Sequence, residues 1–257
     1  MILELLVTIK VALTAMNLQR LIFMRKRYVS RITSLQRRLK SYTIRNADPE
    51  YSKAILPGII LLNGAVYAGW QMDPYYMLKH FTVSHDAIMR YGRFYTLFTS
   101  TISHKDGWHL FGNMFTLFFF GREAIALLGV RKFLTLYLTG GILSSLTHVL
   151  QPYIIPHSWP GAYSHNKRAP ALGASGAVNG LIAYSILMFP TRMIYLYMVI
   201  PVPAALLGVL FIGKDMLGLY SGGGSVGNAG HLAGAAWGAV YFMALKGRGG
   251  MSRFRRF

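Results

Sequence analysis

The 257-residue chain contains no cysteine and only 8 acidic side chains. Without cysteine, disulfides, thiolate-bound zinc and thiol nucleophiles are excluded. Charged residues make up 14% of the chain, against roughly 25% in an average soluble domain, while hydrophobic residues make up 53%. A water-soluble fold of this length needs more polar surface, so the composition indicates an integral membrane protein.

Basic side chains outnumber acidic ones 27 to 8, which gives a net charge of +19. Such an excess is typical of nucleic-acid-binding proteins. Here, however, the basic residues lie between and beside long apolar stretches rather than on one polar domain. We therefore expect basic flanks on a membrane protein, with the lipid bilayer and no nucleic acid as a partner.

Six apolar stretches are long enough to be considered as membrane-spanning helices, which need about 20 residues. The fifth contains Pro201 and Pro203, so we expect it to be kinked or partly broken. The connection at 72–108 is too polar to span, and its scattered aromatic residues are typical of a segment at the membrane interface. The six stretches are residues 54–71, 109–128, 133–150, 173–190, 193–212 and 227–245.

This pattern predicts an all-α, polytopic membrane fold. Its parts are a basic N-terminal helical extension (1–53), a six-span core (54–245) and a basic C-terminal tail (246–257). Six spans place 20 Lys and Arg on the side that holds both tails and 7 on the other, which supports this topology. For residues 1–24 we favour an interfacial or packed helix over an additional span, because two basic side chains make insertion costly.

Gly-Ala-Ser-Gly at residues 173–176 begins the fourth stretch and places Ser175 at the start of a helix. Gly173 and Gly176 allow another backbone to come close. The first amides of a helix have no partner within it and are able to donate to a developing oxyanion. Ser175 is thus a candidate nucleophile, although clusters of small residues are also common where membrane helices simply pack.

His231 lies in the sixth stretch, where an ionisable side chain is costly and suggests function. Gly230, Gly234 and Gly238 recur every four residues and form one smooth helix face. A neutral imidazole is able to take a proton from a serine hydroxyl. The alternative for a lone histidine is a hydrogen bond to a packing partner.

His109 and Asn113 open the second stretch and share one helix face. Both side chains are able to donate hydrogen bonds to an oxyanion. A zinc site is the rival interpretation, but asparagine is a poor ligand and we expect no Glu or Asp beside these residues as a third strong ligand. We therefore expect no metal.

The second, fourth and sixth spans run in the same direction, so His109, Ser175 and His231 are expected at similar depth near one membrane face. This agreement favours a catalytic interpretation over chance. We expect no acidic residue of the spans to lie beside these side chains as a third member, so a Ser–His dyad is the simplest proposal. The polar 151–172 loop is a candidate cap over the site.

Three motifs, correctly ordered on the expected helices, resemble those of the rhomboid intramembrane serine proteases, and the resemblance covers residues 54–245. The stretch 93–104 also looks like the segment that leads into the family's second span. The three motifs are Gly-Ala-Ser-Gly at 173–176, His231 with Gly234 and Gly238 behind it, and His109 with Asn113.

This resemblance implies a nucleophile at Ser175 and a general base at His231. It implies an oxyanion hole made by His109, Asn113 and the Ser175 backbone amide. Substrates would be single-span membrane proteins, cleaved in or beside the membrane where their helix unwinds. No metal or organic cofactor is implied.

Two positions depart from the family's pattern. Ile125 stands where many bacterial members have glutamate, and Glu123 lies two residues earlier. Asn179 stands where an aromatic ring often stacks on the catalytic histidine, which leaves the fine positioning of His231 open.

The chain is similar to the mitochondrial rhomboids of plants and protists in its Ile-Pro-Val-Pro run at 200–203 and its Gly-Lys-Asp at 213–215. The Arg-rich, acid-poor N-terminal region is typical of a mitochondrial targeting or matrix-facing segment, or of a cytoplasmic basic collar on anionic lipid. With the resemblance, the mitochondrial inner membrane is the favoured location.

An active intramembrane endopeptidase is the leading hypothesis, because inactive relatives usually lose the serine or the histidine. The alternative is a catalytically silent rhomboid-like scaffold, a translocase component or a subunit of a mitochondrial membrane complex, which would make a larger membrane complex the partner. A solute transporter has little support, since the sequence shows no inverted repeat, and we expect no buried carboxylate to couple transport to protons or ions.

Overall fold

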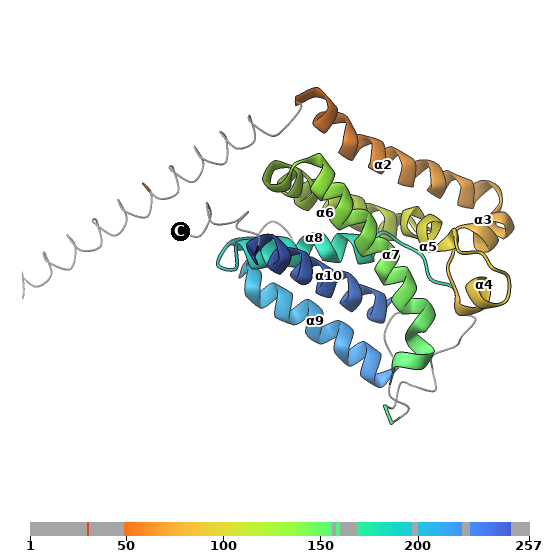
Figure 1. The fold of residues 1–257 in the computed structure, drawn as a ribbon. Helices are drawn as coiled ribbons and strands as arrows, with labels where there is room; N and C mark the ends of the chain where they lie inside the picture. The colour runs from red at the N-terminus through yellow and green to blue at the C-terminus, as the bar shows by residue number, and fades with distance from the viewer. Residues whose placement is uncertain are drawn as a thin grey trace, which may run out of the picture.

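The computed structural model describes residues 30, 49–155, 158–159, 169–196, 200–222 and 227–247. Within them the chain forms helices and one β-hairpin (Figure 1). Most of the predicted N-terminal extension, the C-terminal tail and the candidate cap loop fall outside the described residues. The elements are α2 (Pro49–Met72), α3 (Pro74–His80), α4 (His85–Met89), α5 (Thr96–Thr99), a 3-10 turn (Ser100–Ile102), α6 (Gly107–Leu128), α7 (Val130–Ile154), α8 (Ser175–Met188), β1 (Met193–Leu196), β2 (Ile200–Pro203), α9 (Ala204–Ser221) and α10 (Asn228–Gly247).

The predicted all-α membrane fold is confirmed. Among the described residues, four helices are long and apolar enough to cross a bilayer, namely α2 from Lys53 onward, α6, α7 and α9. Helix α8 is apolar but has only 14 residues, which gives about 21 Å against about 30 Å of hydrocarbon. The count of six spans, which also needs α8 and α10 to cross, stays a prediction.

The expected break at Pro201 and Pro203 is confirmed, but the bounds 193–212 of the fifth span are wrong. The first half of that stretch forms the antiparallel β1–β2 hairpin, and α9 begins only at Ala204. Pro201 and Pro203 have no amide hydrogen, so they are unable to continue a helical hydrogen-bond ladder. The helix is therefore displaced toward the C-terminus, and Asp215 lies inside it.

Helix α8 lies at the centre of the bundle, packed against α6, α7 and α10. Helix α2 lies at one edge against α6, and α9 lies at the opposite edge against α10 and α8 (Figure 1). Leu117, Phe133 and Leu181 are almost fully buried in the main core between α6, α7 and α8. On the outer faces, side chains such as Phe111 and Val209 are exposed, as expected where lipid tails replace water.

Helices α8 and α10 approach until backbone meets backbone. A Cβ atom on Gly234 would overlap the carbonyl oxygen of Gly176, and one on Gly238 would overlap that of Gly180. The contacts advance in the same order along both helices, from Gly176 to Gly180 and from Gly234 to Gly238, so the helices run parallel. Only glycine permits this separation, and close van der Waals contact of this kind drives helix association in membranes.

We predict that Gly234→Ala lowers the free energy of unfolding by about 1–3 kcal/mol, because the added methyl group forces the two backbones apart. The matched control is Gly213→Ala in α9, where a Cβ atom has nothing within 4 Å and the change should be neutral or stabilising by up to about 1 kcal/mol. Denaturant unfolding in detergent micelles measures both. Equal stability of the two variants would contradict the close crossing.

Candidate active site

Ser175 is the first residue of α8, and two hydrogen bonds fix the backbone before it. The Gly173 amide donates to the Ser100 carbonyl at 2.9 Å, and the Ala174 amide donates to His104 Nε2 at 3.3 Å. Gly173 has a φ of +125°, which favours glycine. These constraints hold the Ser175 hydroxyl at the N-terminus of the helix.

Ser175 and His231 lie within hydrogen-bonding distance, 2.8 Å between Oγ and Nε2. His231 occupies the first turn of α10. When the hydroxyl donates to Nε2, a neutral ring carries its own hydrogen on Nδ1. The crossing of α8 and α10 sets this separation, and Ser144 of α7 fills the space beside Gly176 and Gly230 where Cβ atoms would otherwise lie.

The expectation that no acidic side chain in a span is available to this pair is wrong. The Asp215 carboxylate lies with Oδ1 3.4 Å and Oδ2 3.3 Å from His231 Nδ1. Lys214 Nζ lies 3.5 Å from Oδ1 on the outer side. Beginning the helix after Pro203 rather than at residue 193 would have placed this aspartate within a span.

His109, one of the two predicted oxyanion donors, lies beside the serine. A Cβ atom on Gly173 would be 2.8 Å from His109 Cε1 and 3.7 Å from Ser175 Oγ, so only a glycine fits between the two side chains. The zinc alternative gains no support, because no three His, Cys, Asp or Glu side chains converge as ligands in the described part of the chain.

Asn113, the second predicted donor, is buried one turn further along α6. Its Nδ2 donates to the His109 carbonyl at 2.9 Å, and no described contact joins it to Ser175. An amide nitrogen carries two hydrogens, so a second one remains for another acceptor.

The backbone amide of Ser175 is a further donor at the site. The amides of Gly173 and Ala174 are already engaged, whereas amides in the first turn of a helix have no acceptor within it. The Ser175 N–H is therefore placed to donate to a negative oxygen that forms beside its own hydroxyl.

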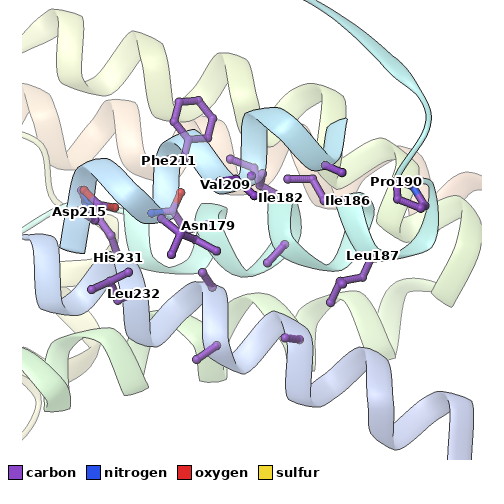
Figure 2. Close-up of a pocket in the computed structure, with 17 residues that line it drawn as sticks. Asn179, Ile182, Ile186, Leu187, Pro190, Val209, Phe211, Asp215, His231 and Leu232 are labelled. Carbon is purple, nitrogen blue, oxygen red and sulfur yellow. The ribbon is translucent and has the colours of Figure 1, made fainter. Parts of the chain in front are cut away.

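A cavity of about 530 Å³ lies beside the site between α8, α9 and α10. Asp215, His231 and Asn179 lie at one end of it and Pro190 at the other, with mainly aliphatic side chains between them (Figure 2). Asn179 stands at the position where an aromatic ring often stacks on the histidine in similar proteins, and here the imidazole borders the cavity.

Glu123 of α6 bonds to the C-terminal half of α8 and to Arg192, the residue before the β1–β2 hairpin. Its Oε1 accepts from Ser185 Oγ at 2.8 Å, and both carboxylate oxygens pair with the Arg192 guanidinium. Ile125, at the family's usual glutamate position, packs against the hydrophobic core. The shifted carboxylate thus joins helices at the end of the bundle opposite Ser175.

His104 provides a pH-dependent prediction. Burial, together with the neighbouring His109, lowers the pKa of His104 from 6.5 to about 3. Since the unfolded chain then binds a proton that the folded chain does not, stability falls as the pH drops from 6.5 toward 3. Lowering the pH from 7 to 5 should remove about 2 kcal/mol of unfolding free energy through this group.

His104→Gln is the comparison, because glutamine keeps an acceptor for the Ala174 amide but does not titrate. Over the same pH interval the variant should lose about 2 kcal/mol less than the wild type, measured by denaturant unfolding in micelles. Identical losses in the two proteins would refute the titration assigned to His104.

Comparison with known proteins agrees with these features. Residues 91–248 match the Rhomboid domain. The chain is 36% identical over 200 residues to "RHOMBOID-like protein 12, mitochondrial" of Arabidopsis thaliana, covering 76% of this chain and 59% of that protein. It is 29% identical over 196 residues to "Rhomboid protein 1, mitochondrial" of Saccharomyces cerevisiae, covering 74% and 53%.

A third relative is "Presenilin-associated rhomboid-like protein A, mitochondrial" of Danio rerio, with 30% identity over 188 residues, 72% of this chain and 46% of that protein. The chain thus spans about half the length of these relatives. Because the Rhomboid domain covers more than half of the sequence, the chain belongs to the rhomboid family.

Proposed function

We propose that this chain is an intramembrane serine endopeptidase in which Ser175 is the nucleophile and His231 the general base. The observation that carries the proposal is the 2.8 Å separation of Oγ and Nε2, made by two side chains that are 56 residues apart in the chain. A serine and a histidine arranged in this way on packed helices form the minimal machinery for acyl transfer.

The chemistry follows from the positions of the donors and acceptors. Ser175 Oγ attacks the peptide carbonyl carbon while its proton passes to His231 Nε2. The resulting oxyanion accepts hydrogen bonds from the Ser175 amide and from His109 and Asn113. The imidazolium then gives its proton to the leaving amine, and water releases the acyl group from the serine by the same steps.

Single-span membrane proteins are the proposed substrates. The peptide groups of an intact helix are hydrogen-bonded to one another and shielded, so a substrate helix must unwind to present a carbonyl to Ser175. The hydrophobic exterior of α9, with Val209 and Leu217 well exposed, suits contact with lipid and with apolar helices.

The mitochondrial inner membrane is the proposed location. The three relatives described above carry "mitochondrial" in their names, and the basic N-terminal region is typical of mitochondrial proteins. A larger membrane complex in that location is a further proposed partner.

We predict that Ser175→Ala and His231→Ala each abolish cleavage of a reporter with one transmembrane helix, since the first variant lacks the attacking oxygen and the second lacks the proton acceptor bonded to it. Matched controls are Ser185→Ala and His85→Ala. Ser185 is a buried serine near the C-terminal end of α8, and the Nε2 of His85 pairs with the Tyr153 hydroxyl. Both controls should keep cleavage near the wild-type rate.

Labelling by a fluorophosphonate separates an enzyme from a silent scaffold without knowledge of the natural substrate. The wild type should be labelled and Ser175→Ala should not. Absence of labelling in a folded wild-type protein, together with absence of reporter cleavage, would favour the scaffold alternative.

We predict that Asn113→Ala slows reporter cleavage about ten- to a thousand-fold, because one oxyanion donor is lost. Thr116→Ala is the control. Thr116 lies on the same helix, and its hydroxyl donates to the carbonyl four residues earlier, that of Gly112, as the Asn113 side chain does to that of His109. Equal cleavage rates in the two variants would assign Asn113 to helix packing alone.

A further inference from the structure

Asp215 is a buried carboxylate on α9, a helix whose exposed side chains are mainly apolar. Only 6% of its surface is exposed, whereas Ile212, Met216 and Leu217 on the same helix are largely exposed. A carboxylate within a membrane helix is costly unless it is paired. The direction in which Asp215 points therefore requires a specific partner in the protein interior.

Two side chains pair with this carboxylate in the described part of the chain. His231 Nδ1 lies 3.3 Å from one oxygen and 3.4 Å from the other. Lys214 Nζ lies 3.5 Å from Oδ1, but its side chain is 70% exposed. Figure 2 shows Asp215 and His231 side by side at one end of the cavity.

We infer that Asp215 is a positioning residue for His231, an assignment that rests on the proposed proteolytic function. Its carboxylate accepts the Nδ1 hydrogen, which leaves the Nε2 lone pair directed at Ser175 Oγ. It also stabilises the imidazolium that forms when Nε2 takes the serine proton. The chain thus uses three side chains, from α8, α9 and α10, where a dyad was expected.

The separations of 3.3 and 3.4 Å fit this role. They exceed the 2.7–2.9 Å of a charge-assisted hydrogen bond, as is common for catalytic groups before substrate binds. The contact has room to shorten when the imidazole becomes charged, so the interaction strengthens at the stage of the reaction that needs it.

A purely structural clamp between α9 and α10 is the competing interpretation. A clamp would affect how α9 packs, and so protein stability and substrate affinity, without an effect on the tautomer of His231. The two interpretations therefore differ in kcat, which reports the proton transfer, and in the state of the imidazole nitrogens.

The test compares Asp215→Asn with the wild type in detergent micelles. Asparagine has the same shape but presents an amide, so kcat for reporter cleavage should fall about 10²- to 10⁴-fold while KM changes less than about threefold. The rate of fluorophosphonate labelling at Ser175 should fall in parallel. Asp215→Glu, which restores a carboxylate, should recover part of kcat.

Asp73→Asn is the matched control, since Asp73 caps α3 at the Tyr76 amide outside the site, and its kcat should equal that of the wild type. Lys214→Met should also leave kcat within about threefold, which separates the carboxylate's effect on His231 from its surface ion pair. An Asp215→Asn protein with wild-type kcat, or one in which KM alone changes, overturns the inference while the dyad stands.

¹⁵N spectra of histidine-labelled protein give a readout that does not need cleavage. The wild-type His231, identified by its loss in His231→Ala, should show one tautomer with the hydrogen on Nδ1. Asp215→Ala should populate both tautomers. An unchanged His231 signal in Asp215→Ala overturns the positioning role, whereas absence of cleavage and labelling in a wild-type protein with the Nδ1–H signal refutes only the proteolytic function.

Discussion

The direct backbone contact between α8 and α10 is the constraint on which the site depends. Ser175 precedes Gly176 by one residue, and His231 precedes Gly234 by three, so both side chains are attached next to the point where the two backbones touch. The 2.8 Å hydrogen bond between the two side chains is lost if the distance between Oγ and Nε2 increases by much less than about 1 Å. A single methyl group in the contact is larger than that tolerance.

Most of the fold was predictable because apolar length and glycine spacing are local signals. The stretches that became α2, α6, α7, α8 and α10 were found within a few residues of their ends. The fifth span was misplaced because an apolar run of the right length does not distinguish a hairpin from a helix. There the two prolines carried more information than hydropathy.

The site was predictable where one motif placed one side chain. Ser175, His231 and His109 come together as the order of the spans suggested. Asp215 is not predicted as a site residue because its place depends on the start of α9, which lies at Ala204, eleven residues after the start of the expected span at 193. His104 was passed over as a site residue because its role, to accept the hydrogen of a backbone amide 70 residues away, has no local signature.

The parallel course of three helices has an electrostatic consequence. Helices α6, α8 and α10 all begin at the site, so the positive ends of three peptide macrodipoles, each about half an elementary charge, meet there in a medium of low dielectric constant. This field stabilises an anion at the site and disfavours a positive charge on the imidazole of His231. Helix α9 runs the other way and brings both its negative end and a carboxylate to the same place. Helix α9 thereby offsets the positive charge of the other three helix ends beside His231, the proton acceptor of the proposed mechanism.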